Sequence, residues 1–153
     1  MTTPEFPASS PRALQAVIAR IESSDNPFAL RFEPLEYAAG AGASLVARIA
    51  ALHGVDEVTG RVIASTSWGL FQIMGFQLWG GSNPYAGTFF AYCMDIDAQR
   101  LAFEDFLSDH GINYLLDELL SNPRKLDAFA AKYNGDAARY IPAMRAAAQA
   151  LGY

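Results

Sequence analysis

The beginning of the chain carries both a start signal and a stop signal for one amphipathic helix. Ser10 is a good N-cap, and Pro11 suits the first helical position. Apolar side chains then recur at the spacing of one helix face, at Leu14, Val17, Ile18 and Ile21. The polar run SSDNP at 23–27 stops the helix. We therefore predict a helix from Pro11 to Ser23, which places Glu22 at the border of the apolar face.

The rest of the chain is also patterned mainly for helices. Further helices are predicted at 44–54, 88–110, 112–120, 124–133 and 136–151, the first of them capped by Ser44 and stopped by Gly54. In the long helix, the side chains expected to face inward are Phe89, Phe90, Cys93, Leu101, Phe106 and Leu107. The segment 28–43 looks irregular, and β-branched residues around a Thr59-Gly60 turn favour a small hairpin within 55–66. The predicted fold class is mainly α, with helices around one core and a small β-hairpin.

The length and the charge of the chain limit the classes of protein to which it can belong. A chain of 153 residues fits one core, so we expect a single domain at 11–153. The first ten residues include two prolines and two serines, which predicts a loose leader at 1–10. The net charge of −5 argues against duplex nucleic acid as a partner, because phosphate binding needs clustered lysine and arginine. No apolar stretch approaches the roughly 18 residues of a membrane span. No basic segment followed by an apolar one marks a signal peptide.

The chain lacks the residue patterns that several kinds of catalytic site require. Cys93 is the single cysteine, which excludes an internal disulfide, and its apolar neighbours favour a buried, inert thiol. His53 and His110 have no partners at metal-ligand spacing, so we expect no zinc site. A Gly-x-Ser-x-Gly motif and a glycine-rich phosphate loop are both absent. We expect neither a metal nor a cofactor.

Three short segments point to a family. They are IESSDNP at 21–27, SWGLFQIMGF at 67–76 and KYNGDAARY at 132–140. In this order they resemble motifs of the lysozyme-like superfamily, whose members cleave the glycan strands of peptidoglycan. Goose-type lysozymes, lytic transglycosylases and the N-acetylmuramidase domain of phage endolysins belong to it, and the last of these matches furthest. Each motif alone is weak, but three in the right order, with the glutamate first, are specific. The resemblance implies a lysozyme-like helical domain.

The resemblance also implies acid catalysis at a glycosidic bond. Glu22 would be the proton donor, because a partly desolvated carboxyl has a raised pKa and keeps its proton near neutral pH. Glu33 is the candidate second carboxylate, acting as a general base on water or stabilising charge on the sugar ring. Glu36 is the alternative second carboxylate. An ordinary ion pair between Glu33 and Arg31 is the competing explanation for Glu33.

Substrate contacts would come from the other two motifs. The candidates are Gln72, Tyr133, Phe71, Trp68 and Asn134. The glutamine would lie in the floor of the groove, and Tyr133 would point its hydroxyl toward Glu22 or the sugar. The two other aromatic residues would stack on sugar faces, and the asparagine would mainly form the turn that aims Tyr133. Structural roles in the core are the alternative for the glutamine and the aromatic residues.

The function expected from the resemblance is hydrolysis of the β-1,4 bond between N-acetylmuramic acid and N-acetylglucosamine. The close rival is a lytic transglycosylase, which forms a 1,6-anhydro-muramic end. Arg31 disfavours it, because soluble transglycosylases often have a small hydroxyl residue at that place. A non-catalytic glycan-binding or virion structural module is the alternative from another class. The expected partner is peptidoglycan, bound by a monomer that is made in the cytoplasm and reaches the wall by release or within a phage particle.

Overall fold

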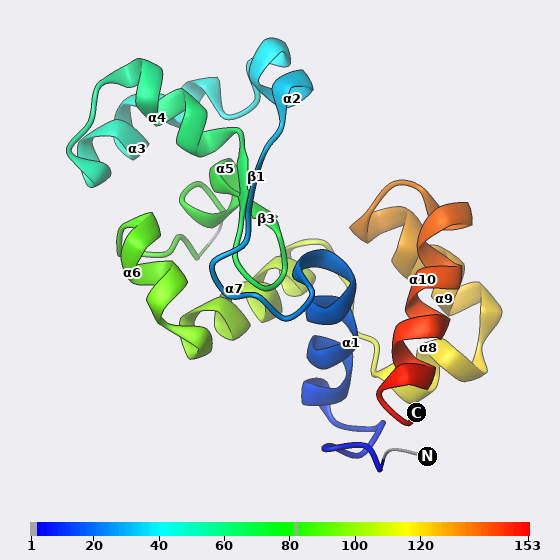
Figure 1. Cartoon of the computed structure of the whole chain (residues 1–153). Coiled ribbons are helices and arrows are strands. Elements are labelled where there is room, and N and C mark those ends of the chain that lie inside the picture. Colours follow the sequence, from blue (N-terminus) through cyan, green and yellow to red (C-terminus); the bar gives the residue numbers. More distant parts are fainter. Residues whose placement is uncertain (1–2, 82) are drawn as a thin grey trace.

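The computed structural model of this protein describes residues 3–81 and 83–153. Its helices lie in two groups, one around a small sheet and one around α1 and α10 (Figure 1). The helices are α1 (Pro11–Ser23), α2 (Pro34–Ala39), the 3-10 turn η1 (Ala43–Leu45), α3 (Val46–His53), α4 (Glu57–Ala64), α5 (Gly75–Leu78), α6 (Phe89–Met94), α7 (Ile96–Asp109), α8 (Leu116–Ser121), α9 (Pro123–Tyr133) and α10 (Ala137–Ala150). The strands are β1 (Leu30–Phe32), β2 (Thr66–Trp68) and β3 (Ile73–Met74). The predicted fold class, mainly α with a small β element, is confirmed, but the strands do not lie in the segment predicted to form them.

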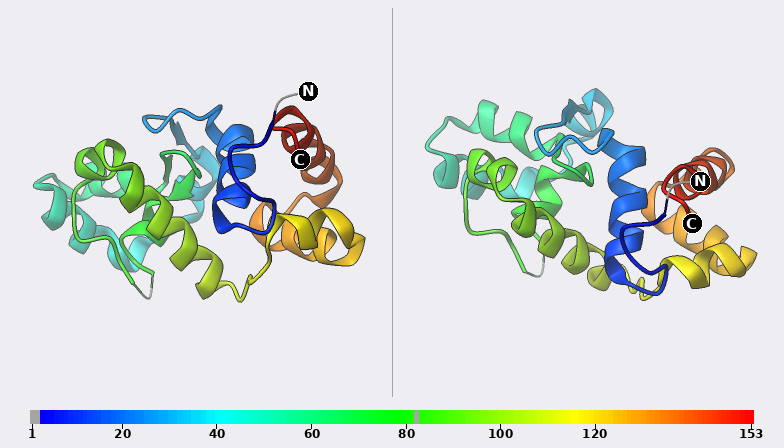
Figure 2. Two further views of the ribbon diagram at one scale, coloured as in Figure 1. Left: turned by 90° about the horizontal axis from the view of Figure 1, so that it is seen from below. Right: turned by 60° about the horizontal axis from the view of Figure 1, so that its bottom comes forward.

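The first described residues, from Thr3 on, and the C-terminus lie close together beside α10 (Figure 2). Phe6 packs against the core, and Asp117 N donates a hydrogen bond to Ala8 O. The division of the chain into a leader and a domain at residue 10 stays a prediction. Within the described residues, none of the helices combines the length and the apolar character needed to cross a membrane.

The first helix has the bounds predicted from the sequence. The Ser10 side chain accepts a hydrogen bond from Arg12 N and so caps the helix start. The helix ends where Ser24 adopts a left-handed conformation (φ 55°) and donates its N–H to Ala19 O. The apolar face of α1 packs against α8 and α10 (Figure 1). Glu22 therefore stands in the last turn of a helix that is capped at both ends.

The second motif forms the antiparallel hairpin of β2 and β3, with β1 on the other side of β2. The turn between β2 and β3 runs from Gly69 to Gln72. In this register, Arg31 of β1 lies opposite Ser67, and Ser67 lies opposite Met74. The sheet thus brings residues that follow α1 beside the hairpin.

The hairpin predicted within 55–66 is wrong, because this segment forms α4. Asp56 caps α4 by accepting a hydrogen bond from Thr59 N at 2.8 Å. Gly60 lies within α4 and not in a turn, and a Cβ atom there would come 2.8 Å from Ala50 Cβ of α3. The close packing of α3 on α4 outweighs the weak strand preference of β-branched residues.

The helix predicted at 88–110 is interrupted. Asp95 adopts an extended conformation (φ −117°, ψ 97°), which ends α6, and its side chain accepts a hydrogen bond from Ala98 N, which starts α7. The break changes which side chains face the core. Phe90 and Leu101, which were predicted to face inward, are 67% and 61% exposed. The other four, Phe89, Cys93, Phe106 and Leu107, are buried or partly buried as predicted.

Three smaller differences concern the bounds of elements. Leu45 rather than Ser44 precedes α3, because Ser44 lies in the 3-10 turn η1, whereas the stop at Gly54 (φ 67°) is confirmed. The helix predicted to begin at 112 begins at Leu116. The segment 28–43, predicted to be irregular, contains β1 and α2.

A fully buried amide on α7 joins three segments of the fold. Gln99 Oε1 accepts a hydrogen bond from Leu70 N at 2.7 Å. Gln99 Nε2 lies 3.1 to 3.2 Å from the carbonyl oxygens of Pro27, Tyr92 and Cys93. One side chain therefore holds together the loop after α1, the β2–β3 hairpin and the end of α6.

Candidate active site

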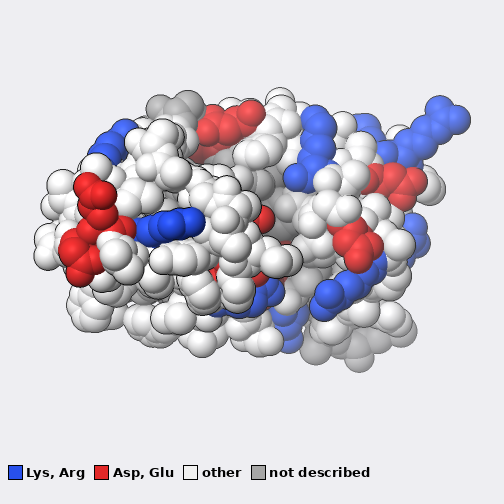
Figure 3. Space-filling model, turned by 90° about the horizontal axis from the view of Figure 1, so that it is seen from above, with Lys and Arg blue, Asp and Glu red and all other residues white. Residues whose placement is uncertain are grey.

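A cleft of about 340 Å³ opens between the two groups of helices. Viewed from above, the molecule is hollowed near its middle, and acidic and basic side chains are interspersed over this face (Figure 3). The three sequence motifs meet in the cleft: its lining includes Glu22 from the first, Phe71 and Gln72 from the second, and Tyr133 and Asn134 from the third. Glu33 lines it as well. The structure thus brings together six of the seven predicted site residues.

Glu22 is a partly buried carboxyl in this cleft. Its Oε1 atom accepts a hydrogen bond from Tyr140 Oη at 2.7 Å. Burial raises the pKa of the Glu22 carboxyl above its ordinary value, whereas the hydrogen bond from Tyr140 and the charge of Arg31 act to lower it. Because desolvation is the largest of these effects, the carboxyl keeps its proton to a higher pH than a free glutamate does. A general acid needs this property.

Tyr140 is the partner of Glu22 that sequence reasoning did not identify. Tyr133 was the tyrosine expected to point toward Glu22 or the sugar, yet its hydroxyl donates to Phe71 O at 2.9 Å. The rings of Tyr133 and Tyr140 lie 5.7 Å apart, and burial raises the pKa of both phenols. Tyr140 ends the third motif, but a tyrosine inside a helix gives no sign of its contact with α1.

Glu33 approaches the cleft from the start of α2. Arg31 Nε donates to Glu33 Oε1 at 2.5 Å, and Ser67 Oγ lies 3.5 Å from the same oxygen. The same Arg31 acts electrostatically on Glu22. Glu33 therefore both lines the cleft and forms the ion pair with Arg31. The ion pair does not exclude a role as general base, because both require the carboxylate form of the side chain. Glu36, in the first turn of α2, lines the cleft too.

Gln72 holds a strained turn beside the cleft. Its φ of 48° is left-handed, a conformation that costs a residue with a Cβ atom roughly 1–2 kcal/mol. Gln72 Nε2 donates to Gly69 O at 3.0 Å and to Ala29 O at 3.2 Å, which fastens the hairpin turn to the loop after α1. No described residue donates to Gln72 Oε1, so this atom can accept a hydrogen bond from a ligand.

The aromatic candidates and the asparagine occupy different environments. Phe71 lines the cleft but is only 2% exposed, and its ring stacks on Phe103 at 4.4 Å. Trp68 is 6% exposed, does not line the cleft, and donates through Nε1 to Ile63 O at 3.1 Å. Trp68 therefore lies in the core, apart from the other predicted site residues. Asn134 is exposed and caps the end of α9 at the cleft.

His53 and Cys93 lie outside the cleft, whereas His110 lines it. His53 Nδ1 lies 2.8 Å from Ile49 O, and His53 Nε2 accepts a hydrogen bond from Phe89 N at 2.9 Å. Cys93 is buried, and burial raises the pKa of its thiol, which disfavours the reactive thiolate. Across residues 3–81 and 83–153, no group of three His, Cys, Asp or Glu side chains is placed to hold a metal ion.

Comparison with known proteins assigns the family. A family model described as N-acetylmuramidase matches residues 36–150. The chain belongs to the N-acetylmuramidase family. The endolysin of Enterobacteria phage PRD1 is 34% identical to this muramidase over 126 residues, which cover 78% of this chain and 83% of that protein. No solved structure matches the chain significantly.

Family membership makes this muramidase a glycoside hydrolase that acts on peptidoglycan. The prediction drawn from the three motifs is confirmed at that level. The range that matches the family model begins after Glu22 and Glu33. The roles of these two carboxyls therefore depend on the cleft geometry and on the motif resemblance.

Proposed function

We propose that this muramidase cleaves the β-1,4 bond between N-acetylmuramic acid and N-acetylglucosamine, with Glu22 as the general acid. The observation that supports this most strongly is the partly buried Glu22 carboxyl in the cleft, whose pKa burial raises. Because Glu22 Oε1 accepts the hydrogen bond from Tyr140, Oε2 is free to carry the proton that is given to the glycosidic oxygen.

Glu33 takes the second role in this proposal. As the bond between the anomeric carbon and the leaving oxygen breaks, positive charge builds on the sugar ring. Glu33 accepts a proton from a water molecule, which attacks the anomeric carbon on the face opposite the leaving group and inverts its configuration. Inverting enzymes leave about 6.5–9.5 Å between the two carboxyls for this water. The ion pair with Arg31 at 2.5 Å keeps Glu33 in place.

The reaction products test the proposal. The protein is incubated with isolated peptidoglycan, and the soluble fragments are analysed by mass spectrometry. Hydrolysis gives muramic acid with reducing ends. In a lytic transglycosylase the muramic 6-hydroxyl replaces water, so each product is lighter by one water molecule. Reducing ends support the proposal, anhydro ends would establish the transglycosylase, and no fragments at all would point to a binding module.

The relative from phage PRD1 supports a biological setting. Because that protein is an endolysin, we place the activity of this muramidase in the breakdown of the bacterial wall during phage infection. The acting species in this proposal is a monomer on the glycan strands of peptidoglycan. Clearing of a permeabilised bacterial suspension by the purified protein is the direct test.

Replacing Glu33 by Gln is expected to lower kcat by about a hundredfold, because an amide cannot accept the proton of the attacking water. KM should change little, since the side chain keeps its size and its Oε1 atom can still accept a hydrogen bond from Arg31. Fragment release from soluble glycan strands measures both constants. Glu36→Gln is the matched control in the same cleft and should retain kcat within about threefold. The opposite outcome, loss in Glu36→Gln alone, would transfer the role to Glu36.

Replacing Tyr140 by Phe is expected to move the alkaline limb of the pH–activity profile to higher pH. The hydrogen bond from Tyr140 lowers the pKa of Glu22, so its removal raises that pKa further and keeps the acid protonated over a wider range. The measurement is kcat/KM against pH for both proteins. Tyr114→Phe, outside the cleft, should leave the limb in place. An unmoved or lowered limb in Tyr140→Phe would contradict the assignment.

A further inference from the structure

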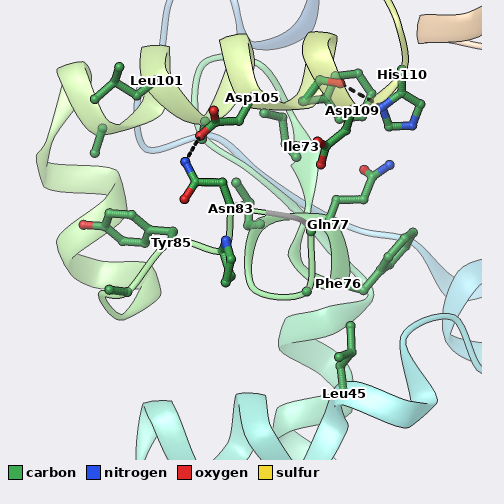
Figure 4. A pocket seen from close by; sticks show the side chains of 18 residues that line it. Leu45, Ile73, Phe76, Gln77, Asn83, Tyr85, Leu101, Asp105, Asp109 and His110 are labelled. Carbon is green, nitrogen blue, oxygen red and sulfur yellow. Dashed lines mark hydrogen bonds between the residues drawn. The ribbon is translucent and has the colours of Figure 1, made fainter.

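A second cavity, of about 510 Å³, adjoins the catalytic cleft. It lies between α7, α5 and the loop that carries Asn83 and Tyr85 (Figure 4). Four residues line both spaces: Ile73, Gln77, Phe106 and His110. The volume is in the range of about 300–1,000 Å³ that small-molecule sites occupy. A polymer bound in the cleft therefore has a second, connected space beside it.

The floor and one side of this cavity are apolar. The side chains concerned are Leu45, Phe76, Leu78, Ala98, Leu101 and Ala102. Leu101 projects from α7 at this side and is one of the apolar residues left exposed to solvent (Figure 4). An apolar surface of this kind suits methyl and methylene groups. It suits sugar rings less well, since a hydroxyl buried without a hydrogen-bond partner costs roughly 2–7 kcal/mol.

The charge of the cavity has one sign. Asp105 and Asp109 stand one turn apart on α7 and project toward the cavity (Figure 4). Asp105 also accepts a hydrogen bond from Asn83 Nδ2 at 2.8 Å, which fixes its position. Among the described residues that line the cavity, none is a lysine or an arginine. Such a site favours the ammonium group of a ligand.

We propose that this cavity binds the stem peptide of a muramic acid residue held in the cleft, with the free ammonium group of its diamino acid facing Asp105 and Asp109. The inference rests on the proposed muramidase function. The N-acetylated sugars of the glycan carry no cation, whereas a stem peptide that is not cross-linked carries an amine on its diamino acid. Its alanine methyl groups match the apolar floor.

The covalent geometry of the substrate allows this placement. The peptide is attached to the lactyl group of muramic acid, so it leaves the glycan at the sugar itself. An extended peptide of about four residues spans at most ~14 Å. The cavity and the cleft share part of their lining, so the peptide can enter the cavity without leaving the surface. The site would then favour strands that carry peptides with a free amine.

A pair of substrates isolates the charge. Soluble glycan strands with uncross-linked stem peptides are divided into two portions, and the free amine is acetylated in one of them. Acetylation changes neither the glycan nor the lactyl amide. Fragment release by the purified protein gives kcat/KM for each portion at one fixed pH. We expect about threefold to tenfold higher kcat/KM on the free amine, the size of a partly screened ion pair.

Variants of the two aspartates test whether the preference for a free amine arises in the cavity. The double variant Asp105→Asn, Asp109→Asn is expected to cleave both portions at the rate that wild type shows on acetylated strands. Asparagine at 105 retains an oxygen for the hydrogen bond from Asn83, so the fold should survive. Asp127→Asn, on the exposed side of α9 and outside the cavity, is the matched control and should keep the wild-type preference.

Three results would overturn the inference. They are equal rates of wild type on both portions, a preference that persists in the double variant, and an equal loss on both portions, which would mean that the cavity holds sugar. Failure of the underlying function looks different, because wild type would then cleave neither portion or would release fragments with anhydro ends. Strands stripped of peptides by an amidase give a further check: the double variant and wild type should cleave them equally well.

Discussion

Replacing Glu22 by Gln is expected to abolish cleavage of peptidoglycan while the fold remains intact. Glutamine has the same shape as glutamic acid, and its Oε1 atom can still accept the hydrogen bond from Tyr140. The amide cannot give a proton to the leaving oxygen, so kcat should fall by about a hundredfold to ten-thousandfold. Fragment release from peptidoglycan measures the loss, and circular dichroism checks the fold.

The same variant should be more stable than wild type at alkaline pH. Burial raises the pKa of Glu22, so the folded protein holds this proton more tightly than the unfolded chain does. That stabilisation is complete at acidic pH and is lost as the pH rises through the raised pKa. Glutamine never ionises, so we expect Tm of Glu22→Gln to exceed that of wild type by about 2 °C at pH 8 and to equal it at pH 4.

A surface variant of the same kind is the control. Glu57→Gln, exposed on α4 and outside the cleft, should leave kcat unchanged. Retained lysis by Glu22→Gln would remove the assignment of the acid. Lower stability at pH 8 would mean that the carboxylate form of Glu22 is the one that the fold favours.

Local signals predicted the parts of the fold that positioned the acid. The cap at Ser10 and the left-handed stop at Ser24 bound α1 almost independently of the rest of the chain. The three motifs were predicted to form one site, and Glu22, Gln72 and Tyr133 do line one cleft. Motifs in a fixed order carry information about distant contacts, which patterns of apolar residues do not.

Errors arose where packing between elements decided the structure. The β-branched residues around Gly60 favoured strands, but α4 packs so closely on α3 that a helix with a glycine at the contact is stable. The break between α6 and α7 depends on Asp95, whose side chain caps the start of α7 while its extended backbone ends α6. Tyr140 reaches Glu22 across 118 positions of sequence, and no local pattern predicts such a contact.

Gln99 does not line the cleft, yet its replacement should destabilise the segments that form the cleft. The amide joins the loop after α1 to the hairpin that carries Phe71 and Gln72, through Pro27 O and Leu70 N. Leucine has a similar volume but offers neither donor nor acceptor. Gln99→Leu would leave the buried Leu70 N–H without a partner and would remove the hydrogen bond to Pro27 O, and each unsatisfied buried group costs about 1–3 kcal/mol.

We therefore expect Gln99→Leu to lower the free energy of unfolding by about 3–5 kcal/mol, a large part of the 5–15 kcal/mol typical of a domain. Urea unfolding followed by the fluorescence of Trp68 and Trp79, both buried, measures the change. Gln149→Leu, the same replacement at an exposed position of α10, should cost less than about 0.5 kcal/mol. A loss below about 1 kcal/mol in Gln99→Leu would mean that the loop and the hairpin hold their positions without the amide, since the remaining apolar packing would then suffice.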